Sequence, residues 1–119
     1  MAGRRVQRLN EQLKREIIDI VRREVKDPRV GDLVVTGVEV TADLSFARVY
    51  VQVPQREDEE ETLAGLQAAA PFIRAQIGER LRVRRTPELR FEPDHSLEHA
   101  RRINELLAEA GLDEDETDG

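Results

Sequence analysis

The sequence predicts a single α+β domain in which a three-stranded sheet packs on helices that cover one face. Apolar residues recur every three or four positions in residues 4–26, 63–81 and 97–107, which indicates helices. Residues 33–40, 47–53 and 83–92 alternate between apolar and polar positions over at least part of their length, which indicates strands. We therefore expect one domain over residues 1–111 and an acidic, disordered tail over residues 112–119.

The first three elements should be a long helix and a β-hairpin. The apolar stripe of the helix consists of Val6, Leu9, Leu13, Ile17, Ile20 and Val21. The helix should end near Asp27-Pro28, because proline disfavours helical geometry in the residue before it. Residues 41–45 are rich in turn formers and separate the first two strands, so we expect those strands to pair in antiparallel fashion.

Pro71 divides the next helical stretch. We expect two helices separated by a kink at Ala69, Ala70 and Pro71, with the proline in the first turn of the second helix, where its missing N–H costs nothing. On that second helix, Ala75 and Gly78 form a face of small residues. Such a face permits close approach of a phosphate backbone or close packing of another helix, and periodicity favours neither.

A last helix should begin near residues 94–96 and end at Gly111. His95 and His99 are four residues apart, a spacing that two metal ligands can use. The pair lacks a clear third ligand, and we interpret it as part of a polar, solvated first turn that Asp94 or Ser96 caps. We predict no metal ion and no cofactor.

Charge is distributed unevenly along the chain. The net charge is −6, but five acidic residues lie in residues 57–61 and five more in residues 113–118, and the rest of the chain carries +4. Basic residues are concentrated in residues 1–29 and 72–91. This asymmetry is typical of a protein that binds a polyanion, although charge counts alone also fit basic residues that only solvate helix faces.

The motifs of common enzymes and nucleotide-binding proteins are absent. No two glycines have the spacing of a Gly-x-x-Gly clamp or a Walker A loop, and no serine lies in a Gly-x-Ser-x-Gly elbow. We therefore expect no enzyme activity and no small-molecule substrate. The chain has only three phenylalanines and one tyrosine, so we expect any RNA binding to depend on arginines and shape rather than on base stacking.

The composition also bears on location. The chain has no cysteine, which fits a reducing cytoplasm, and its longest apolar run, residues 68–73, is far too short to span a bilayer. We expect a cytoplasmic monomer that does not bind membranes.

Several short segments follow one another over about residues 4–108. They are Lys26-Asp27-Pro28-Arg29, residues 38–44, residues 47–51, Phe72-Ile73-Arg74, residues 82–91 with Pro87-Glu88-Leu89, Asp94-His95-Ser96, and Arg102-Ile103-Asn104-Glu105-Leu106-Leu107. In their order and spacing they resemble the bacterial ribosome-binding factor A family. Each segment is a weak signal alone. Their joint order carries the resemblance.

The resemblance implies a type II KH-like domain with the order α-β-β-α-kink-α-β and an additional C-terminal helix. It also implies a non-enzymatic, cytoplasmic factor that binds the free small (30S) ribosomal subunit or its precursors, supports late assembly and 5′-end processing of 16S rRNA, and matters for growth in the cold. The family's kink has an Ala-x-Gly element, and this chain has Ala69-Ala70-Pro71, with proline in place of the glycine.

Two hypotheses of different classes follow. In the first, the chain binds ribosomal RNA, and seven arginines contact phosphates: Arg22, Arg29, Arg74, Arg80, Arg82, Arg84 and Arg85. In the second, the chain is an acidic protein-interaction module of KH-like fold that does not bind RNA. Cosedimentation with small subunits at low and high salt separates the two hypotheses.

Overall fold

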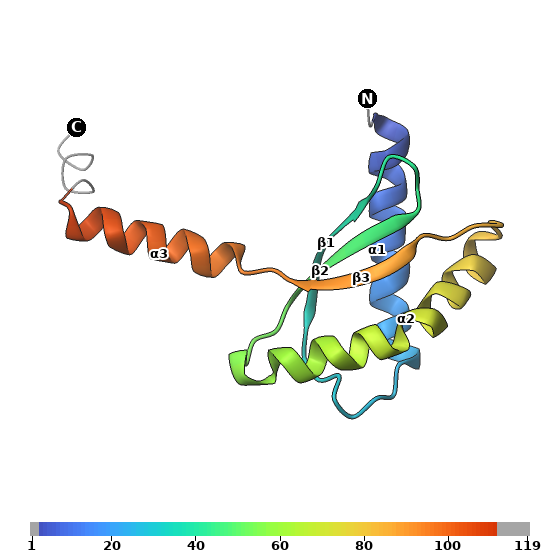
Figure 1. Ribbon diagram of the computed structural model, residues 1–119, viewed down its shortest axis with the longest axis horizontal. Helices are drawn as coiled ribbons and strands as arrows, with labels where there is room; N and C mark the ends of the chain where they lie inside the picture. The colour runs from blue at the N-terminus through green and yellow to red at the C-terminus, as the bar shows by residue number, and fades with distance from the viewer. Residues whose placement is uncertain (1–2, 112–119) are drawn as a thin grey trace.

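The computed structural model describes residues 3–111 and arranges them as a small sheet with two helices against it and a third helix that projects outward (Figure 1). The elements in chain order are α1 (Arg4–Glu24), β1 (Val34–Val40), β2 (Phe46–Gln52), the 3₁₀ turn η1 (Arg56–Asp58), α2 (Glu59–Leu81), β3 (Glu88–Pro93) and α3 (Ser96–Glu109). The predicted order of helices and strands is confirmed except at Pro71. The predicted tail over residues 112–119 lies outside the described residues.

The three strands lie in the order β1-β2-β3. β1 and β2 pair in antiparallel fashion, with Val38 opposite Val49, and a bulge lies between Val35 and Gly37. β2 and β3 are parallel, with Ala47 opposite Leu89. A parallel pair needs a crossover connection, and α2 supplies it. The predicted hairpin of the first two strands is therefore confirmed.

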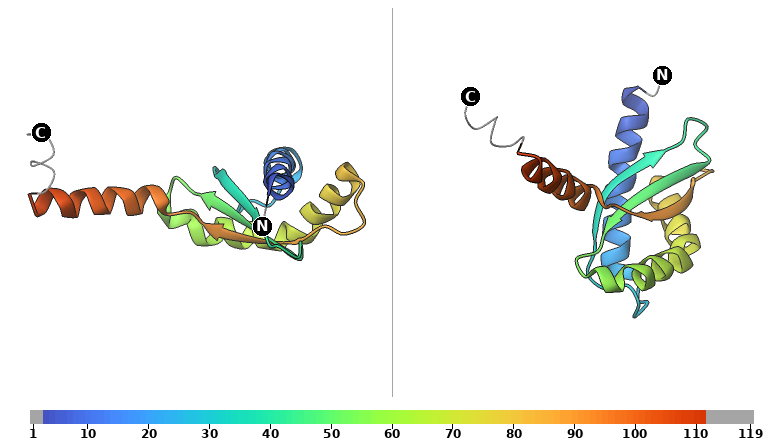
Figure 2. Two further views of the ribbon diagram at one scale, coloured as in Figure 1. Left: turned by 90° about the horizontal axis from the view of Figure 1, so that it is seen from above. Right: turned by 60° about the vertical axis from the view of Figure 1, so that its left-hand side comes forward.

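Both α1 and α2 cover the same face of the sheet (Figure 2). Alternate residues of β2 are fully buried against them: Ala47, Val49 and Val51. Leu13, Ile17 and Ile20 of α1 and Leu66, Ile73 and Ile77 of α2 complete this core. The other residues of β2 lie on the open face, where the Arg90 guanidinium stacks 4.2 Å from the centroid of the Phe46 ring. The prediction of helices on one face is confirmed.

The third strand is shorter than predicted. It begins at Glu88, and residues 83–87 form a loop instead. The physical reason lies at Arg82, which adopts the left-handed conformation (φ 54°, ψ 43°) at the end of α2. This conformation changes the direction of the chain at the end of α2. Residues 83–87 therefore do not pair with β2, although their sequence alternates as a strand does.

Pro71 lies inside α2 and not in the first turn of a second helix, so the prediction of two separate helices is wrong. Proline removes only one donor from the helix, and its ring crowds the carbonyl of Gln67 one turn earlier. A bend relieves that crowding, and the ribbon of α2 changes direction between its green and yellow halves (Figure 1). Ile73 and Ile77, beyond the bend, are fully buried, so the bend keeps the second half of α2 against the core.

Candidate nucleic-acid interface

The loop after α2 carries three of the seven predicted arginines and is held at both ends. At its start, the backbone N–H groups of Arg82 and Val83 both donate to the carbonyl of Gly78, the second over 3.3 Å. At its end, Arg74 Nε donates to the carbonyl of Thr86 over 3.0 Å. Arg74 therefore positions the loop, and the residue is half-buried.

The side chains of the three loop arginines take no part in these contacts. Arg82, Arg84 and Arg85 are exposed, and none of them has an ion pair or a side-chain hydrogen bond within residues 3–111. Three guanidinium groups within four residues provide many donors in a geometry that suits phosphate oxygens. We call residues 82–86 the arginine loop.

Arg80, two residues before the arginine loop, is engaged in the fold. Its Nη1 lies 3.0 Å from Glu16 Oε1 and 2.8 Å from Asp19 Oδ2, both on α1. The Arg80 side chain is only 28% exposed, and its hydrogen bond is the main reason that the pKa of Asp19 lies below its usual value. Arg80 thus joins α2 to α1.

Arg29 is also engaged, in the turn that follows α1. Its Nη2 lies 2.7 Å from Asp27 Oδ2, its Nε lies 3.1 Å from Asp27 Oδ1, and its backbone N–H donates to the same carboxylate. These bonds from Arg29 lower the pKa of Asp27 from 3.8 to about 2. The turn rests on α2, where Thr62 Oγ1 donates to the Arg29 carbonyl.

Arg22 is exposed in the last turn of α1, beside a groove between α1 and β1 that Ile18, Val21, Val25, Val30 and Leu33 line. The structure does not bring Arg22 together with the arginine loop, because the end of α1 lies below α2 and the loop lies at the right-hand edge of the molecule (Figure 1). The predicted set of seven arginines therefore divides into three engaged, three exposed on one loop, and Arg22 apart.

The predicted small-residue face is exposed at Ala75 and half-buried at Gly78. A Cβ atom at position 78 would lie 3.6 Å from Thr86 Cγ2, so the neighbour of Gly78 is the arginine loop and not another helix. In the kink, Ala70 is buried, Ala69 half-buried and Pro71 exposed. Approach of a phosphate backbone to Ala75 and Gly78 stays a prediction.

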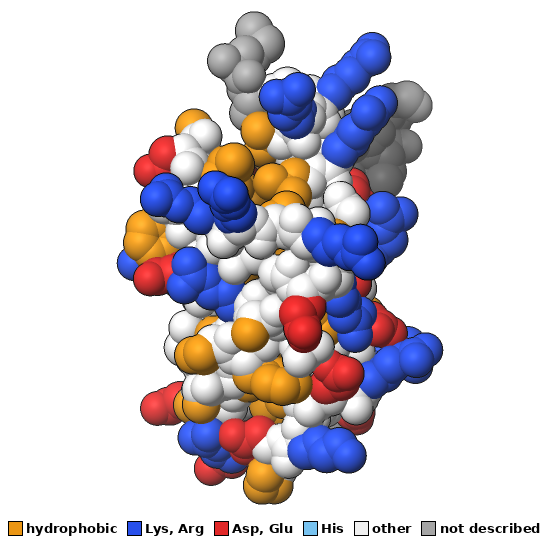
Figure 3. All heavy atoms as spheres, turned by 90° about the vertical axis from the view of Figure 1, so that its right-hand side faces the viewer, with side chains coloured by type: hydrophobic (Ala, Val, Ile, Leu, Met, Phe, Trp, Pro, Cys, Tyr) orange, Lys and Arg blue, Asp and Glu red, His pale blue; other side chains and the backbone are white. Residues whose placement is uncertain are grey.

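The side of the molecule that carries the end of α2 is rich in basic side chains. Lys and Arg predominate over the upper half of this surface, whereas acidic and basic side chains mix in the lower half (Figure 3). Three of the exposed arginines of α1 border a shallow hollow together with Gln7, Glu11 and Gln12: Arg4, Arg8 and Arg15. On this face, the upper half therefore offers the larger positive surface to a polyanion.

Comparison with known proteins identifies the family. The family model described as ribosome-binding factor A matches residues 5–107. The chain belongs to this family. It is 52% identical over 119 residues to ribosome-binding factor A of Halothermothrix orenii, covering 99% of this chain and 97% of the relative. It is 45% identical over 116 residues to that of Natranaerobius thermophilus, covering 97% and 88%.

Solved structures of the ribosome-binding factor A family share the fold. The crystal structure from Thermus thermophilus superposes with a TM-score of 0.70 at 33% identity, over 76% of this chain and 97% of the other. A Thermus thermophilus homology model fitted into the cryo-EM map of a 30S complex gives a TM-score of 0.62 at 34% identity, over 72% and 91%. The predicted KH-like α+β class is confirmed.

The family resemblance did not predict how the free edge of β3 is covered. Gln67 of α2 donates from Nε2 to the Leu89 carbonyl over 3.0 Å and accepts at Oε1 from the Phe91 N–H over 3.1 Å. Its amide thus takes the place of a neighbouring strand, which protects an edge that would otherwise be open for pairing. In the sequence, Gln67 has the appearance of an ordinary exposed helix residue.

The two histidines differ in their surroundings. His95 Nε2 lies 2.7 Å from Glu59 Oε2, so the prediction of a solvated imidazole is wrong there, whereas His99 is exposed. Asp94 accepts from the Ser96 N–H over 2.9 Å, but it precedes the N-cap residue, which is His95 and has no side-chain capping bond, so the prediction of a cap from Asp94 or Ser96 is wrong. Among residues 3–111, no group of three or more potential ligands could hold a metal ion, and no helix is long and apolar enough to cross a membrane.

Proposed function

We propose that this member of the ribosome-binding factor A family binds the free small (30S) ribosomal subunit or its precursors and supports late assembly and 5′-end processing of 16S rRNA. It acts by binding, without enzymatic chemistry, and the arginine loop contacts rRNA phosphates. The proposal rests on one observation: the side chains of Arg82, Arg84 and Arg85 are exposed and have no ion pair within the described residues. They lie on a loop that hydrogen bonds hold at both ends.

The charge and the shape of the loop favour a structured polyanion. Guanidinium groups that no carboxylate neutralises attract phosphates, and each phosphate contact releases counterions from the nucleic acid. Because Arg74 and the helix end hold the loop, little conformational freedom is lost on binding. A ribosome-binding factor A of Thermus thermophilus forms a 30S complex, which supports the small subunit as the partner.

The test uses the double variant Arg84→Gln/Arg85→Gln and protein-free 16S rRNA as the probe. We expect weaker binding and a salt dependence that flattens by up to ~0.9 per lost contact, because each arginine neutralises one phosphate. The matched control is Arg101→Gln/Arg102→Gln on α3, which changes the net charge equally and should leave the salt slope unaltered.

The same measurement addresses the second hypothesis, a protein-interaction module that does not bind RNA. An unmodified chain that binds small subunits but not rRNA, with no dependence on salt, would support that module. Equal losses in the double variant and in its control would show that net charge, and not the arginine loop, governs binding.

A further inference from the structure

α3 stands apart from the rest of the molecule. It projects away from the sheet and from both other helices (Figures 1 and 2), and none of its residues is buried. Leu97, Ile103 and Leu106 are 65%, 43% and 59% exposed. At about 100° per residue, Ile103 and Leu106 lie on one side of the helix with Ala100 and Leu107, and these four residues form an apolar stripe. Leu97 lies at the margin of this stripe, half a turn from Leu106.

An apolar stripe of this kind normally faces a core. A helix of 14 residues is also only marginally stable alone in water, so packing usually supplies most of its stability. Within residues 3–111, no residue of the stripe is buried, and only Leu97, at its margin, lines a cleft against the body. The stripe therefore has the properties of a surface that a partner covers.

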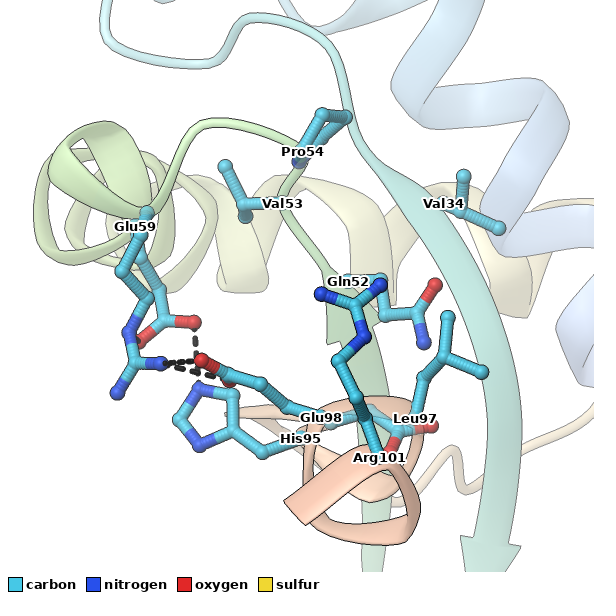
Figure 4. A pocket seen from close by; sticks show the side chains of 11 residues that line it. Val34, Gln52, Val53, Pro54, Glu59, His95, Leu97, Glu98 and Arg101 are labelled. Atoms are coloured by element: carbon cyan, nitrogen blue, oxygen red, sulfur yellow. Dashed lines mark hydrogen bonds and ion pairs between the residues drawn. The ribbon is translucent and has the colours of Figure 1, made fainter. Parts of the chain in front are cut away.

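The first turn of α3 is nevertheless held firmly against the body. Three polar pairs join this turn and the two residues before it to β1, α2 and η1: Thr36–Asp94 at 2.5 Å, Glu59–His95 at 2.7 Å and Arg56–Glu98 at 2.6 Å. They border a cleft in which Leu97 and Val34 lie near one another (Figure 4). These pairs orient the helix before any partner arrives, which lowers the entropic cost of binding.

Charge indicates what kind of partner fits. Residues 96–119 contain eight acidic residues and two arginines, and therefore carry the whole net charge of −6. Residues 1–95 balance seventeen acidic residues with seventeen basic ones. Phosphates repel such an arm, whereas a positively charged protein attracts it.

We propose that α3 is a second binding element, which inserts its apolar stripe into a groove on a positively charged protein of the small subunit. The helix-in-groove mode requires apolar anchors one turn apart, and Ile103, Leu106 and Leu107 provide them. The inference rests on the proposed function in one respect, since the partner protein belongs to the small subunit. The arginine loop then binds RNA while α3 binds protein.

A second copy of this chain fits the stripe less well. Two arms that each carry −6 repel one another. One 14-residue helix also offers too little surface for the ~1,200 Å² or more that a stable interface buries. The acidic ridge of Glu98, Glu105 and Glu109, opposite the stripe, would remain in solvent in the proposed complex.

The test compares Ile103→Gln/Leu106→Gln with the control Arg101→Gln/Glu105→Gln in the full chain; the control residues are exposed on the side opposite the stripe, and their joint change leaves the net charge unaltered. Glutamine keeps helix propensity, so circular dichroism should show similar helix content in both variants. The apolar variant should bind purified small subunits at least about tenfold more weakly, because two aliphatic anchors are lost. Binding to protein-free 16S rRNA should not change, and the control should match the unmodified chain on both probes.

A photo-cross-linking residue at position 106 identifies the neighbour directly. On small subunits we expect cross-links to protein, whereas the same residue at position 84 should cross-link to rRNA. Cross-links from position 106 to rRNA or to a second copy, their absence, or an apolar variant that binds subunits normally would overturn the inference while leaving the proposed function intact. An unmodified chain that binds neither probe overturns both.

Discussion

Arg80 and the arginine loop are neighbours in the sequence but differ in what they contact. Arg80 lies between Glu16 and Asp19 of α1, whereas Arg82, Arg84 and Arg85 have no acidic partner in the described residues. The difference follows from the left-handed turn at Arg82, which directs the chain away from α1 immediately after the last contact with it. Neighbouring arginines thus fall into two groups: an engaged group that makes contacts within the fold, and an available group whose side chains can bind a partner.

Arg29 and Arg74 belong with Arg80. Each satisfies an acceptor in a segment that connects two elements: the Asp27 carboxylate in the turn after α1, and the Thr86 carbonyl in the arginine loop. Variants that change stability and RNA binding separately can test whether the arginines fall into these two groups. Variants of the engaged group should alter stability alone, and variants of the arginine loop should alter binding.

The largest expected effect concerns the surface on which the Arg29 turn rests. A Cβ atom at Gly65 would lie 2.8 Å from Val30 Cγ2 and 3.2 Å from Arg29 Cβ, so Gly65→Ala forces the turn away from α2. Overpacking of this kind costs 1–3 kcal/mol, which outweighs the gain of about 1 kcal/mol in helix propensity. We expect denaturant unfolding to show a loss of about 1 kcal/mol.

Gly78→Ala is the matched control in the same helix. There the new Cβ would lie 3.6 Å from Thr86 Cγ2, an ordinary contact, so the variant should gain up to about 1 kcal/mol from helix propensity. The two variants should therefore differ by about 2 kcal/mol. Equal changes in the free energy of unfolding would show that the turn moves away from α2 at little cost, and that the position of Arg29 does not depend on its packing against Gly65. RNA affinity should be unchanged in Gly65→Ala at a temperature where the variant is folded.

Arg82→Gly should separate stability from binding with opposite signs. A non-glycine residue in the left-handed region costs on the order of 1 kcal/mol, and glycine is the residue that helix ends of this type favour. The variant should therefore gain up to about 1 kcal/mol in denaturant unfolding while binding rRNA more weakly. Arg82→Asn, which tolerates the same backbone conformation, should lose binding with a smaller change in stability.

A gain in stability with unchanged rRNA binding would place Arg82 outside the interface and leave the binding to Arg84 and Arg85. A loss of both would mean that the Arg82 side chain makes contacts in solution that stabilise the fold. In either case Arg82 would no longer belong to the available group of arginines.

The sequence predicts the sheet, its hairpin and the core well, because periodicity records which residues of an element face inward. The stripe of α1 and the alternation of β2 correspond closely to the buried residues of the structure. Pro71 was misjudged for a physical reason: local preference opposes a proline inside a helix, but Ile73 and Ile77 pack on the core beyond it and retain the helix around it.

The candidate site was less predictable than the fold. A sequence gives the number of arginines but not their partners, and the partners of Arg80 and Arg74 lie 61 and 12 residues away, at Asp19 and Thr86. Only the pairing of Arg29 with Asp27 is local, in the segment Asp27-Pro28-Arg29, and could have been anticipated. The pairing of Gln67 with β3 likewise depends on tertiary packing that no local pattern records.

The smallest expected effect is the pH dependence of the Arg29 turn. The pKa of Asp27 is lowered to about 2 by Arg29, so the ionised carboxylate stabilises the folded state above its usual pKa of 3.8. That contribution should disappear as the pH falls from about 4 through about 2. Asp27→Asn should therefore have a slightly lower Tm than the unmodified chain at pH 6, and the two Tm curves should converge near pH 2.

Arg29→Gln distinguishes the two roles of this arginine. If Arg29 belongs to the engaged group, the variant should show a reduced pH dependence, because the Asp27 carboxylate loses its side-chain donor. The reduction should be smaller than in Asp27→Asn, because the backbone N–H of residue 29 can still donate to the carboxylate. The affinity of the variant for protein-free 16S rRNA should equal that of the unmodified chain. A loss of rRNA binding in Arg29→Gln without a change in the Tm curve would move Arg29 to the available group, since its guanidinium would then exchange Asp27 for a phosphate on binding.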